Sequence, residues 1–304
     1  MEAAGSYGDR FSYQAGLSAK EFGDFRAGGD TGSVVNSAYG ERGADLKLQL
    51  YPDDDQQLTL LVQSYRQDDV PRTETTIFSK PFRGTSPGKE LRRDHDQKRF
   101  LSYLSYSRAP AGSVIGEMNL TLSYQETVET RWRVQADERS DQSGFDVGTL
   151  GLQAHFHSNS SWGRLTYGVD YYRDSVDSFR TDFNADGSVA RVRIQGPVAD
   201  DASYQLFDVY LQDELTLAEE RLTVLVGARF SHQELDARRV EDPLTGLEIA
   251  IRDDWSTVLG SIRALWRLDS AGADRWRLFA SVGQAFRAPN LSDVTRLDAT
   301  SAVE

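Results

Sequence analysis

Eleven segments of the chain alternate apolar and polar side chains with a period of two. In the clearest one, 115–126, Leu120 and Leu122 fall on the opposite face from Asn119 and Thr121. Because successive side chains of a β-strand point to opposite faces, this alternation predicts strands with one apolar and one polar face. The predicted strands span residues 9–21, 42–51, 57–68, 98–108, 115–126, 146–158, 161–174, 203–216, 220–236, 253–269 and 274–286.

The connections between these segments alternate between long and short along the whole chain. In order, they contain 20, 5, 29, 6, 19, 2, 28, 3, 16 and 4 residues. Transmembrane β-barrels show this arrangement, with short turns at the periplasmic rim and long loops outside. The strands also exceed the length of about 5–6 residues that is usual in globular proteins and suit a tilted membrane crossing. We therefore predict an all-β fold, an antiparallel up-and-down transmembrane β-barrel with its long connections at one end.

The composition allows a barrel and argues against other classes of protein. The chain has no apolar run of about 18 residues, so a helical membrane protein is excluded. Its net charge of −13 and pI of about 4.8 argue against a nucleic-acid partner, which requires a basic surface. Because the chain has no cysteine, disulfides and thiolate metal sites are excluded as well.

Both ends of the chain are interpreted as internal to a larger barrel. Residues 1–7 have neither the basic start nor the apolar core of a secretory signal peptide. Eleven is an odd number of strands, whereas bacterial single-chain barrels have even numbers, and a loop follows the last predicted strand. We therefore expect residues 1–304 to be a partial β-barrel domain, with the upstream part and the C-terminal strands missing.

The period of two also assigns a face to each side chain. We expect lipid contact for Leu120, Leu122, Leu165, Val169, Val224, Val226 and Trp276, and a lumenal position for Glu117, Thr121, Arg164, Arg263 and Arg277. Asp213 breaks the pattern, because it shares a face with Phe207, Val209 and Leu211. A β-bulge or a position at the barrel rim would explain this exception.

The last predicted strand ends in a motif that identifies a family. Directly after an alternating strand, the chain reads Phe286, Arg287, Ala288, Pro289, Asn290 and Leu291. This motif closely resembles the signature of TonB-dependent outer-membrane receptors, where it closes a barrel strand and opens an extracellular loop. The strand that ends in Gln-Asp-Glu-Leu at 212–215, together with the next strand at 221–230, is similar to the same family.

This resemblance implies a location, a function and partners. In the family, a barrel of about 22 strands, closed by an N-terminal plug, lies in the outer membrane of Gram-negative-type bacteria. It imports scarce nutrients such as ferric siderophores, haem or cobalamin with energy from the TonB complex, and it is not an enzyme. The chain is thus expected to supply about half of such a barrel. It should contact outer-membrane lipid, depend on TonB through the missing N-terminal part, and hold no resident cofactor.

Two other functional classes share parts of this pattern. A passive porin has the same barrel without a plug, and upstream sequence for a plug and a TonB-binding segment would distinguish the two. A soluble β-rich binding or adhesive protein predicts extraction without detergent. The sequence contains no Ser/His/Asp order, nucleophile motif or phosphate-binding glycine loop, so no enzymatic activity is predicted.

The predicted loop 69–97 holds the candidate ligand-binding residues. It carries six Lys or Arg against five Asp or Glu in a chain whose net charge is −13. Arg92, Arg93 and His95 lie near its end, and arginine side chains suit carboxylate or phosphate groups. An anionic chelate such as a ferric siderophore is the leading hypothesis, and haem bound through His95 is the second. The alternative is a solvated loop whose charges serve solubility or contact lipopolysaccharide.

Two histidines are candidate metal ligands. His155 and His157 are two residues apart and therefore share the polar face of one strand. They could bind a metal or haem in the lumen, but no third ligand is nearby in the sequence. Polar residues that face a water-filled lumen are therefore the preferred interpretation.

A second candidate metal site is a calcium-binding loop. Asp182, Asn184 and Asp186 occupy positions 1, 3 and 5 of the loop pattern, and a glycine follows at position 6. Position 12 is Arg193, where the pattern requires a bidentate Glu. An Asp-Gly turn in a long loop, with residues 189–194 as one arm of a hairpin, is therefore preferred.

Overall fold

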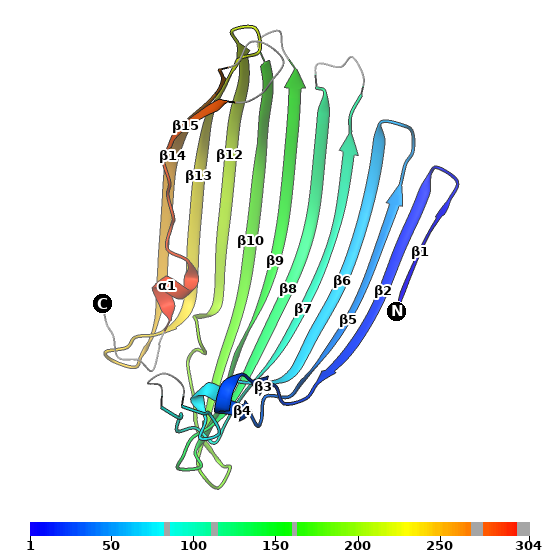
Figure 1. Ribbon diagram of the computed structural model, residues 1–304. Coiled ribbons are helices and arrows are strands. Elements are labelled where there is room, and N and C mark those ends of the chain that lie inside the picture. Colours follow the sequence, from blue (N-terminus) through cyan, green and yellow to red (C-terminus); the bar gives the residue numbers. More distant parts are fainter. Residues whose placement is uncertain (82–85, 111–114, 160–162, 269–275, 297–304) are drawn as a thin grey trace.

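The computed structural model describes residues 1–81, 86–110, 115–159, 163–268 and 276–296, and it forms one large curved β-sheet (Figure 1). Each strand of the main path is hydrogen-bonded to the next strand along the chain. These strands are β1 (Glu2–Tyr7), β2 (Phe11–Phe22), β5 (Tyr39–Leu50), β6 (Gln56–Pro71), β7 (Arg92–Arg108), β8 (Glu117–Val134), β9 (Ser140–Asn159), β10 (Gly163–Phe183), β12 (Asp200–Leu217), β13 (Leu222–Glu241), β14 (Glu248–Arg267) and β15 (Arg277–Gly283).

The remaining elements are short. The strand β11 (Val189–Val192) pairs with the end of β10, and β3 (Arg26–Ala27) pairs with β4 (Gly32–Ser33). Three single-turn helices complete the fold, namely η1 (Gly29–Thr31), η2 (Thr73–Thr75) and α1 (Leu291–Thr295). Figure 1 shows them near the same end of the sheet. Within the described ranges, no helix is both long and apolar enough to cross a membrane.

The antiparallel order predicted from the sequence is confirmed. Every neighbouring pair in the main path is antiparallel, and each predicted strand is present. One strand of the main path was not predicted: β1 pairs with β2 from Glu2↔Gly16 to Tyr7↔Phe11. Its Ala-Ala-Gly-Ser centre has no alternation of apolar and polar residues, so its pairing is set by the ladder with β2. The short pair β3 and β4 was not predicted either, because residues 22–41 were expected to form a loop.

The strands are longer than predicted at the end that bears the long connections. Residues 127–145 were expected to form a loop, yet β8 and β9 leave only the turn 135–139 between them. Likewise, only 242–247 connects β13 to β14. Charged cross-strand contacts continue the ladder after the apolar alternation has ended, as where Arg239 pairs with Asp200 and Glu248. The strict alternation of connection lengths is therefore wrong, whereas the grouping of the predicted long connections at one end is confirmed.

The two faces of the sheet differ in chemistry. We define the inner face as the face against which α1 packs, and the opposite face as the outer face. The register confirms the predicted assignments within the strands: Leu122 lies between Leu104 and Leu152 on the outer face, and Thr121 lies between Ser105 and Gln153 on the inner face. The outer apolar belt is the set of outer-face residues Leu46, Leu48, Leu58, Leu60, Val62, Leu104, Leu120, Leu122, Leu152, Val169, Phe207 and Val209.

The register also resolves two uncertain positions. In β7, Leu104 and Tyr106 face outward, which settles the ambiguous pattern at 98–108. Asp213 lies opposite Leu165 and Val226 on the outer face, and the ladders show no register shift there. The bulge considered for Asp213 is therefore wrong, and the residue lies on the outer face near the turn that follows β12.

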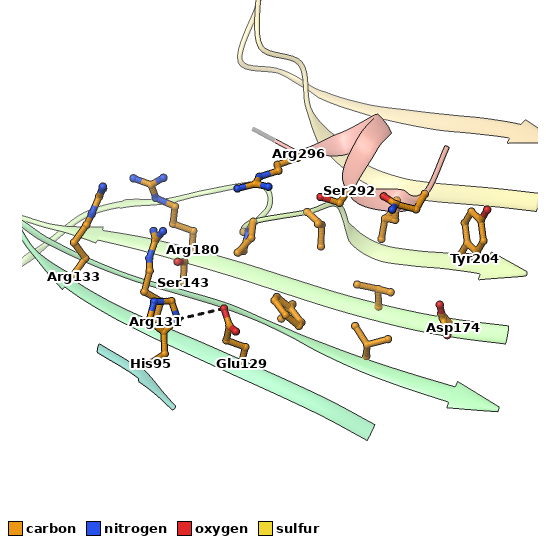
Figure 2. A pocket seen from close by; sticks show the side chains of 18 of the residues that line it. His95, Glu129, Arg131, Arg133, Ser143, Asp174, Arg180, Tyr204, Ser292 and Arg296 are labelled. Atoms are coloured by element: carbon orange, nitrogen blue, oxygen red, sulfur yellow. Dashed lines mark ion pairs between the residues drawn. The ribbon is translucent and has the colours of Figure 1, made fainter. Parts of the chain in front are cut away.

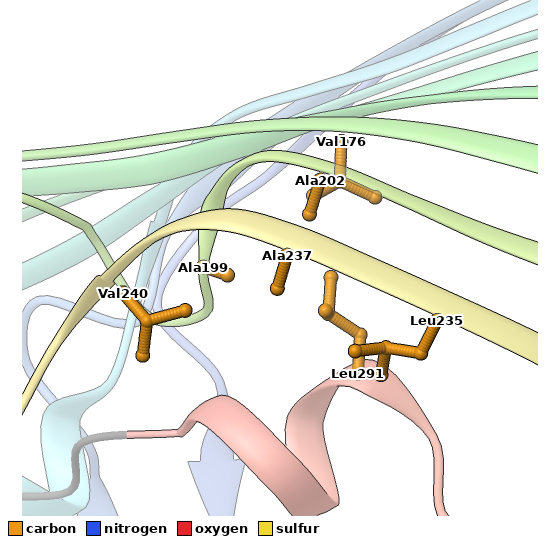
Figure 3. Packing of buried hydrophobic residues seen from close by; sticks show 7 residues of the cluster. All are labelled: Val176, Ala199, Ala202, Leu235, Ala237, Val240 and Leu291. Atoms are coloured by element: carbon orange, nitrogen blue, oxygen red, sulfur yellow. The ribbon is translucent and has the colours of Figure 1, made fainter. Parts of the chain in front are cut away.

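A small apolar core fixes the chain after β15 to the inner face. Leu291 of α1 packs against Val176, Ala202, Leu235 and Ala237, which come from three strands (Figure 3). Leu235 is 0% exposed, although it lies on a sheet whose two faces are largely accessible. The motif that follows β15 thus folds back onto the inner wall at the end with the long connections.

Candidate functional site

Cross-strand pairing brings cationic side chains together in two rows on the inner face. In the first row, His95 of β7 lies opposite Arg131 of β8. The row continues from Arg131 to Ser143 of β9 and from Ser143 to Arg180 of β10. In the second row, Arg93 lies opposite Arg133 and Arg133 opposite Asp141. Because residues two apart on a strand share a face, both rows point to the same side. Cations that are far apart in the sequence therefore become neighbours.

These rows form one wall of a cavity of about 620 Å³ (Figure 2). The opposite wall consists of residues 196–198 and of α1 with its flanks. Six arginines line the cavity against two carboxylates, Glu129 and Asp174. The arginines are Arg72, Arg93, Arg131, Arg133, Arg180 and Arg296.

Carboxylates next to the cavity hold several of these arginines in place. Asp141 is only 1% exposed and accepts hydrogen bonds from Arg131 at 2.8 Å and from Arg133 at 2.6 Å. His95 Nδ1 lies 3.4 Å from a carboxylate oxygen of Glu129. Gln97 donates a hydrogen bond of 2.7 Å to the same carboxylate. Fixed partners orient the guanidinium and imidazole groups without a ligand present.

Several polar atoms in the cavity wall have no partner. Among the residues that the structure describes, Arg93 Nε, His95 Nε2, Arg131 Nε and Ser143 Oγ are buried and make no hydrogen bond. An unpaired buried polar group costs about 1–3 kcal/mol, so such groups call for a partner that the chain does not supply. All four belong to residues that line this cavity, which is where an anion would accept their hydrogen bonds.

The motif after β15 forms part of the cavity. Pro289 ends the extended segment, and Asn290 caps α1 by accepting a hydrogen bond of 2.9 Å from the Asp293 backbone N–H. The Asn290 N–H in turn donates to Asp293, and Arg287 pairs with the same carboxylate at 2.6 Å. The Asn290 backbone and Arg287 together hold the pKa of Asp293 below its usual value. This capping box directs Leu291 and Ser292 into the cavity wall.

Hydrogen bonds from a distant loop lock α1 in this position. Gln195, which is buried, donates to the Thr295 carbonyl at 2.7 Å and accepts from the Glu241 N–H at 3.0 Å. The Ala199 N–H donates to Thr295 Oγ1 at 2.9 Å. The connection between β10 and β12 therefore fixes the helix against β13.

Replacing Asn290 by alanine is expected to destabilise α1 by about 1 kcal/mol, because the side-chain half of the capping box is lost. Amide hydrogen exchange at Asp293 should become roughly fivefold faster, whereas exchange in β9 should not change. Ser292→Ala is the matched control, since Ser292 lies in the same helix and is not its cap. Equal exchange in both variants would contradict the role of the cap.

The structure places the three predicted ligand residues on different faces. Arg93 and His95 line the cavity, as do several arginines that are distant in sequence. Arg92 lies on the outer face, where it pairs with Asp94 and, at 3.3 Å, with Asp69. Only two of the three candidates are thus brought together.

The two histidines considered as metal ligands have protein partners. His155 Nε2 lies 2.8 Å from Asp170 Oδ1, and the ring contacts Tyr210 edge-on. His157 Nδ1 lies 2.9 Å from Thr166 Oγ1. Both side chains belong to the inner face, as the sequence predicted.

The segment considered as a calcium loop is the turn of a hairpin. Asp182 pairs with Arg180 at 2.8 Å and with Arg193 at 2.6 Å, so Arg193 neutralises this carboxylate. Asn184 and Asp186 both hydrogen-bond to Ser188. The hairpin with 189–194 as an arm is confirmed in β11. Across the described ranges, no group of three or more acidic or histidine side chains is placed to hold a metal ion.

Arg131, Arg133 and Arg180 are cavity residues that the sequence did not single out. They fell within predicted loops, where a side chain cannot be assigned to a face. A signal was nevertheless present, because Glu129, Arg131 and Arg133 alternate with Thr130 and Trp132. Alternation of charged and uncharged residues with a period of two predicts a strand, just as alternation of apolar and polar residues does.

These features define the wall of a transmembrane β-barrel with a cationic cavity on its inner face. A family model described as the TonB dependent receptor-like β-barrel matches residues 6–301. The chain therefore belongs to the TonB-dependent receptor β-barrel family. Members of this family are receptors and transporters rather than enzymes.

Solved structures share the fold at low sequence identity. The copper transporter OprC is 17% identical with a TM-score of 0.71, over 93% of this chain and 42% of that chain. The unliganded ferric citrate transporter FecA is 18% identical with a TM-score of 0.67, over 92% of this chain and 40% of that one. The hemophore receptor HasR of Serratia marcescens is 16% identical with a TM-score of 0.70, over 95% and 43%.

The chain thus spans about two fifths of the length of the solved structures that it matches. No curated protein matches its sequence.

Proposed function

We propose that the chain is part of the barrel wall of an outer-membrane receptor that takes up an anionic nutrient chelate. The inner-face cavity carries this proposal, because among the described residues six arginines line it and four of its buried polar atoms lack partners. In the complete receptor, the plug would lie inside the barrel and the TonB complex would supply energy for uptake. The outer membrane of a Gram-negative-type bacterium is the proposed location.

The chemistry of the cavity favours a ligand with several oxygen anions. Guanidinium groups form paired hydrogen bonds with carboxylate and phosphate oxygens, and such charge-assisted bonds are roughly twice as strong as neutral ones. Arg93 and Arg131 each keep an Nε–H that no described residue pairs with. A ferric siderophore with exposed carboxylate oxygens provides the matching acceptors. Ferric citrate, which the structurally similar FecA transports, has this chemistry.

Haem is the second candidate, and one observation favours it. His95 Nε2 is buried in the cavity wall and has no hydrogen-bond partner within the described ranges, while Nδ1 faces Glu129. A histidine whose other nitrogen is held by a carboxylate is the usual arrangement of an imidazole ligand to iron. The haem propionates would then meet the arginines on β8.

Binding of a defined chelate tests whether the cavity is the ligand site. The receptor that contains this chain is expressed with Arg93→Gln and Arg131→Gln, and binding of ferric citrate and of haem is measured separately. The double variant is expected to bind the true ligand class at least about tenfold more weakly, because each charge-assisted hydrogen bond contributes about 1.5–3 kcal/mol. His95→Ala should weaken haem binding and leave ferric citrate binding nearly unchanged.

Arg92→Gln, compared with Arg93→Gln alone, is the matched control, since each removes one positive charge and Arg92 lies next to Arg93 but on the outer face. Its binding is expected to equal that of the unmodified receptor. Binding that is unchanged in the double variant for both probes, at low and at high salt, would remove the cavity from the ligand site. Equal losses for Arg92→Gln and for Arg93→Gln alone would show that only the overall charge matters.

A further inference from the structure

A patch of buried polar side chains lies on the inner face of β12 and β13. Asp208 of β12 is 1% exposed, and Gln233 of β13 is 5% exposed. Ser231, also buried, lies directly opposite Asp208 and accepts a hydrogen bond of 2.5 Å from Gln233 Nε2. Because side chains two apart on a strand share a face, the three belong together. We refer to Asp208, Ser231 and Gln233 as the buried polar patch.

Residues 284–290, which we call the strap, run from β15 to α1 across this patch (Figure 1). At one end, the Gln284 N–H donates to the Gly260 carbonyl of β14 at 3.0 Å, and the Gly260 N–H donates to Gln284 Oε1 at 2.9 Å. At the other end, the Pro289 carbonyl accepts a hydrogen bond of 3.3 Å from Tyr204 of β12. Because β13 lies between β14 and β12, the strap must cross β13. The buried polar patch lies at this crossing, since its β13 residues fall between the partners of Gly260 and Tyr204.

Two oxygens of the buried polar patch have no hydrogen-bond donor. Among the described residues, Asp208 Oδ1 and Gln233 Oε1 are buried and make no hydrogen bond. Both atoms are acceptors only, so neither can satisfy the other. The remaining polar atoms of the same side chains are in use, because Asp208 Oδ2 pairs with Arg229 and Gln233 Nε2 donates to Ser231. Buried acceptors of this kind require a donor or a cation from outside the chain.

The charges around the patch favour a cation over a neutral donor. Asp170 of β10 lies directly opposite Asp208, and cross-strand neighbours of like charge repel each other. Arg229 is the counter-ion of Asp208, and His155 Nε2 lies 2.8 Å from Asp170. With His155 neutral, two carboxylates share one guanidinium, which leaves one negative charge in excess. A buried water molecule would satisfy the unpaired oxygens but would not balance this charge.

We propose that the buried polar patch binds an alkali-metal cation, with Asp208 Oδ1 and Gln233 Oε1 as ligands. Hard cations are bound by carboxylate and amide oxygens of this kind. A single positive charge matches the single excess negative charge, and Arg287 of the strap adds no net charge because Asp293 pairs with it. The site is distinct from the ligand cavity and does not depend on which nutrient the cavity takes.

The cation would hold the strap against the wall. An open strap would admit water to the buried polar patch, and the two oxygens would then regain hydrogen bonds from solvent. The cation therefore binds the closed strap more tightly, and a ligand that prefers one state of a protein stabilises that state. Because α1 follows the strap and forms part of the cavity wall, the cation would also keep this wall in place.

Hydrogen exchange of the purified receptor that contains this chain tests the proposal. Exchange of residues 286–296 is compared in sodium chloride, potassium chloride and choline chloride at equal ionic strength. At about ten times the midpoint of the titration with the alkali cation, exchange should be roughly tenfold slower than in choline, because binding stabilises the closed state by that factor. Asp208→Asn and Gln233→Met should each abolish the difference between the salts. Calcium chloride at the same ionic strength should have a smaller effect than the alkali cation.

Glu234→Gln is the matched control, since it removes a carboxylate from the residue next to Gln233 but from the outer face. It should retain the effect of the alkali cation. Crystals of the receptor grown with thallium(I), a heavy ion that replaces potassium, should show an anomalous peak between Asp208 and Gln233. Each of the following results would overturn the proposal: equal exchange in all three chloride salts, a cation effect that survives in both patch variants or disappears in the control, a larger effect of calcium, or no anomalous peak at the patch.

Discussion

Leu122→Arg is expected to lower the stability of the assembled barrel by about 2–4 kcal/mol, whereas Thr121→Arg should cost far less. The two positions are adjacent in β8, so a difference in stability between the two variants reflects the face on which the arginine lies and not its place along the strand. Leu122 lies in the middle of the outer apolar belt and is 48% exposed, flanked by Leu104 and Leu152. A guanidinium placed there must leave water for hydrocarbon, while an arginine at Thr121 remains in a polar lumen.

Unfolding in urea of the receptor reconstituted in lipid vesicles would measure the difference. The midpoint for Leu122→Arg should shift strongly, and that for Thr121→Arg should stay close to that of the unmodified protein. Similar shifts for the two variants would mean that the faces of β8 are not distinguished by lipid. The outer face would then not be the membrane surface.

Leu235→Ala is expected to weaken the docking of α1 on the inner face by about 2–5 kcal/mol. Leu235 is completely buried against Leu291, and alanine would leave a cavity between β13 and the helix. Amide exchange in residues 286–296, measured by mass spectrometry, should accelerate by at least about 30-fold, because 1.4 kcal/mol corresponds to a factor of ten. The strands of the main sheet should keep their protection.

Leu211→Ala is the matched control for this experiment, since Leu211 lies on the neighbouring strand β12 with its side chain on the outer face. In detergent, it should leave exchange in 286–296 unchanged. If Leu235→Ala left the exchange of that segment unaltered as well, the apolar core would not be what holds the motif to the wall. The hydrogen bonds of Gln195 and Thr295 would then carry the docking.

Much of the sheet could be predicted because membrane strands follow a simple rule. A side-chain period of two, together with an apolar outer face, fixes which face each residue takes. Leu120, Arg164 and Arg263 lie on their predicted faces for this reason. The ends of the strands were harder to predict, because beyond the apolar belt the strands are joined by charged pairs that have no hydrophobic pattern.

The candidate site was only partly predictable, and the pair Arg92 and Arg93 shows why. Both were chosen for their charge, but one residue of displacement along a strand reverses the face. Arg93 lines the cavity, and Arg92 pairs with Asp94 on the other side of the sheet. Without knowing that β7 begins at Arg92, no argument from charge could separate them.

The placement of α1 could not be derived from the sequence at all. Its contacts join Thr295 to Gln195 and Ala199, about one hundred residues earlier, through two hydrogen bonds. No periodic pattern reports a contact of this kind. The motif at 286–291 could be recognised, but its position inside the wall depends on a loop whose sequence carries no corresponding signal.

The short turn at 135–139 reduces the conformational entropy that the protein loses when a ligand binds. Because β8 and β9 remain hydrogen-bonded up to this turn, the backbones that carry Arg131 and Arg133 are already ordered before a ligand arrives. A long mobile loop in the same place would have to lose conformational freedom on binding, which reduces affinity. Association at this wall should therefore need no slow closing step. Its rate constant is expected to follow electrostatic attraction and to fall steeply as the ionic strength rises.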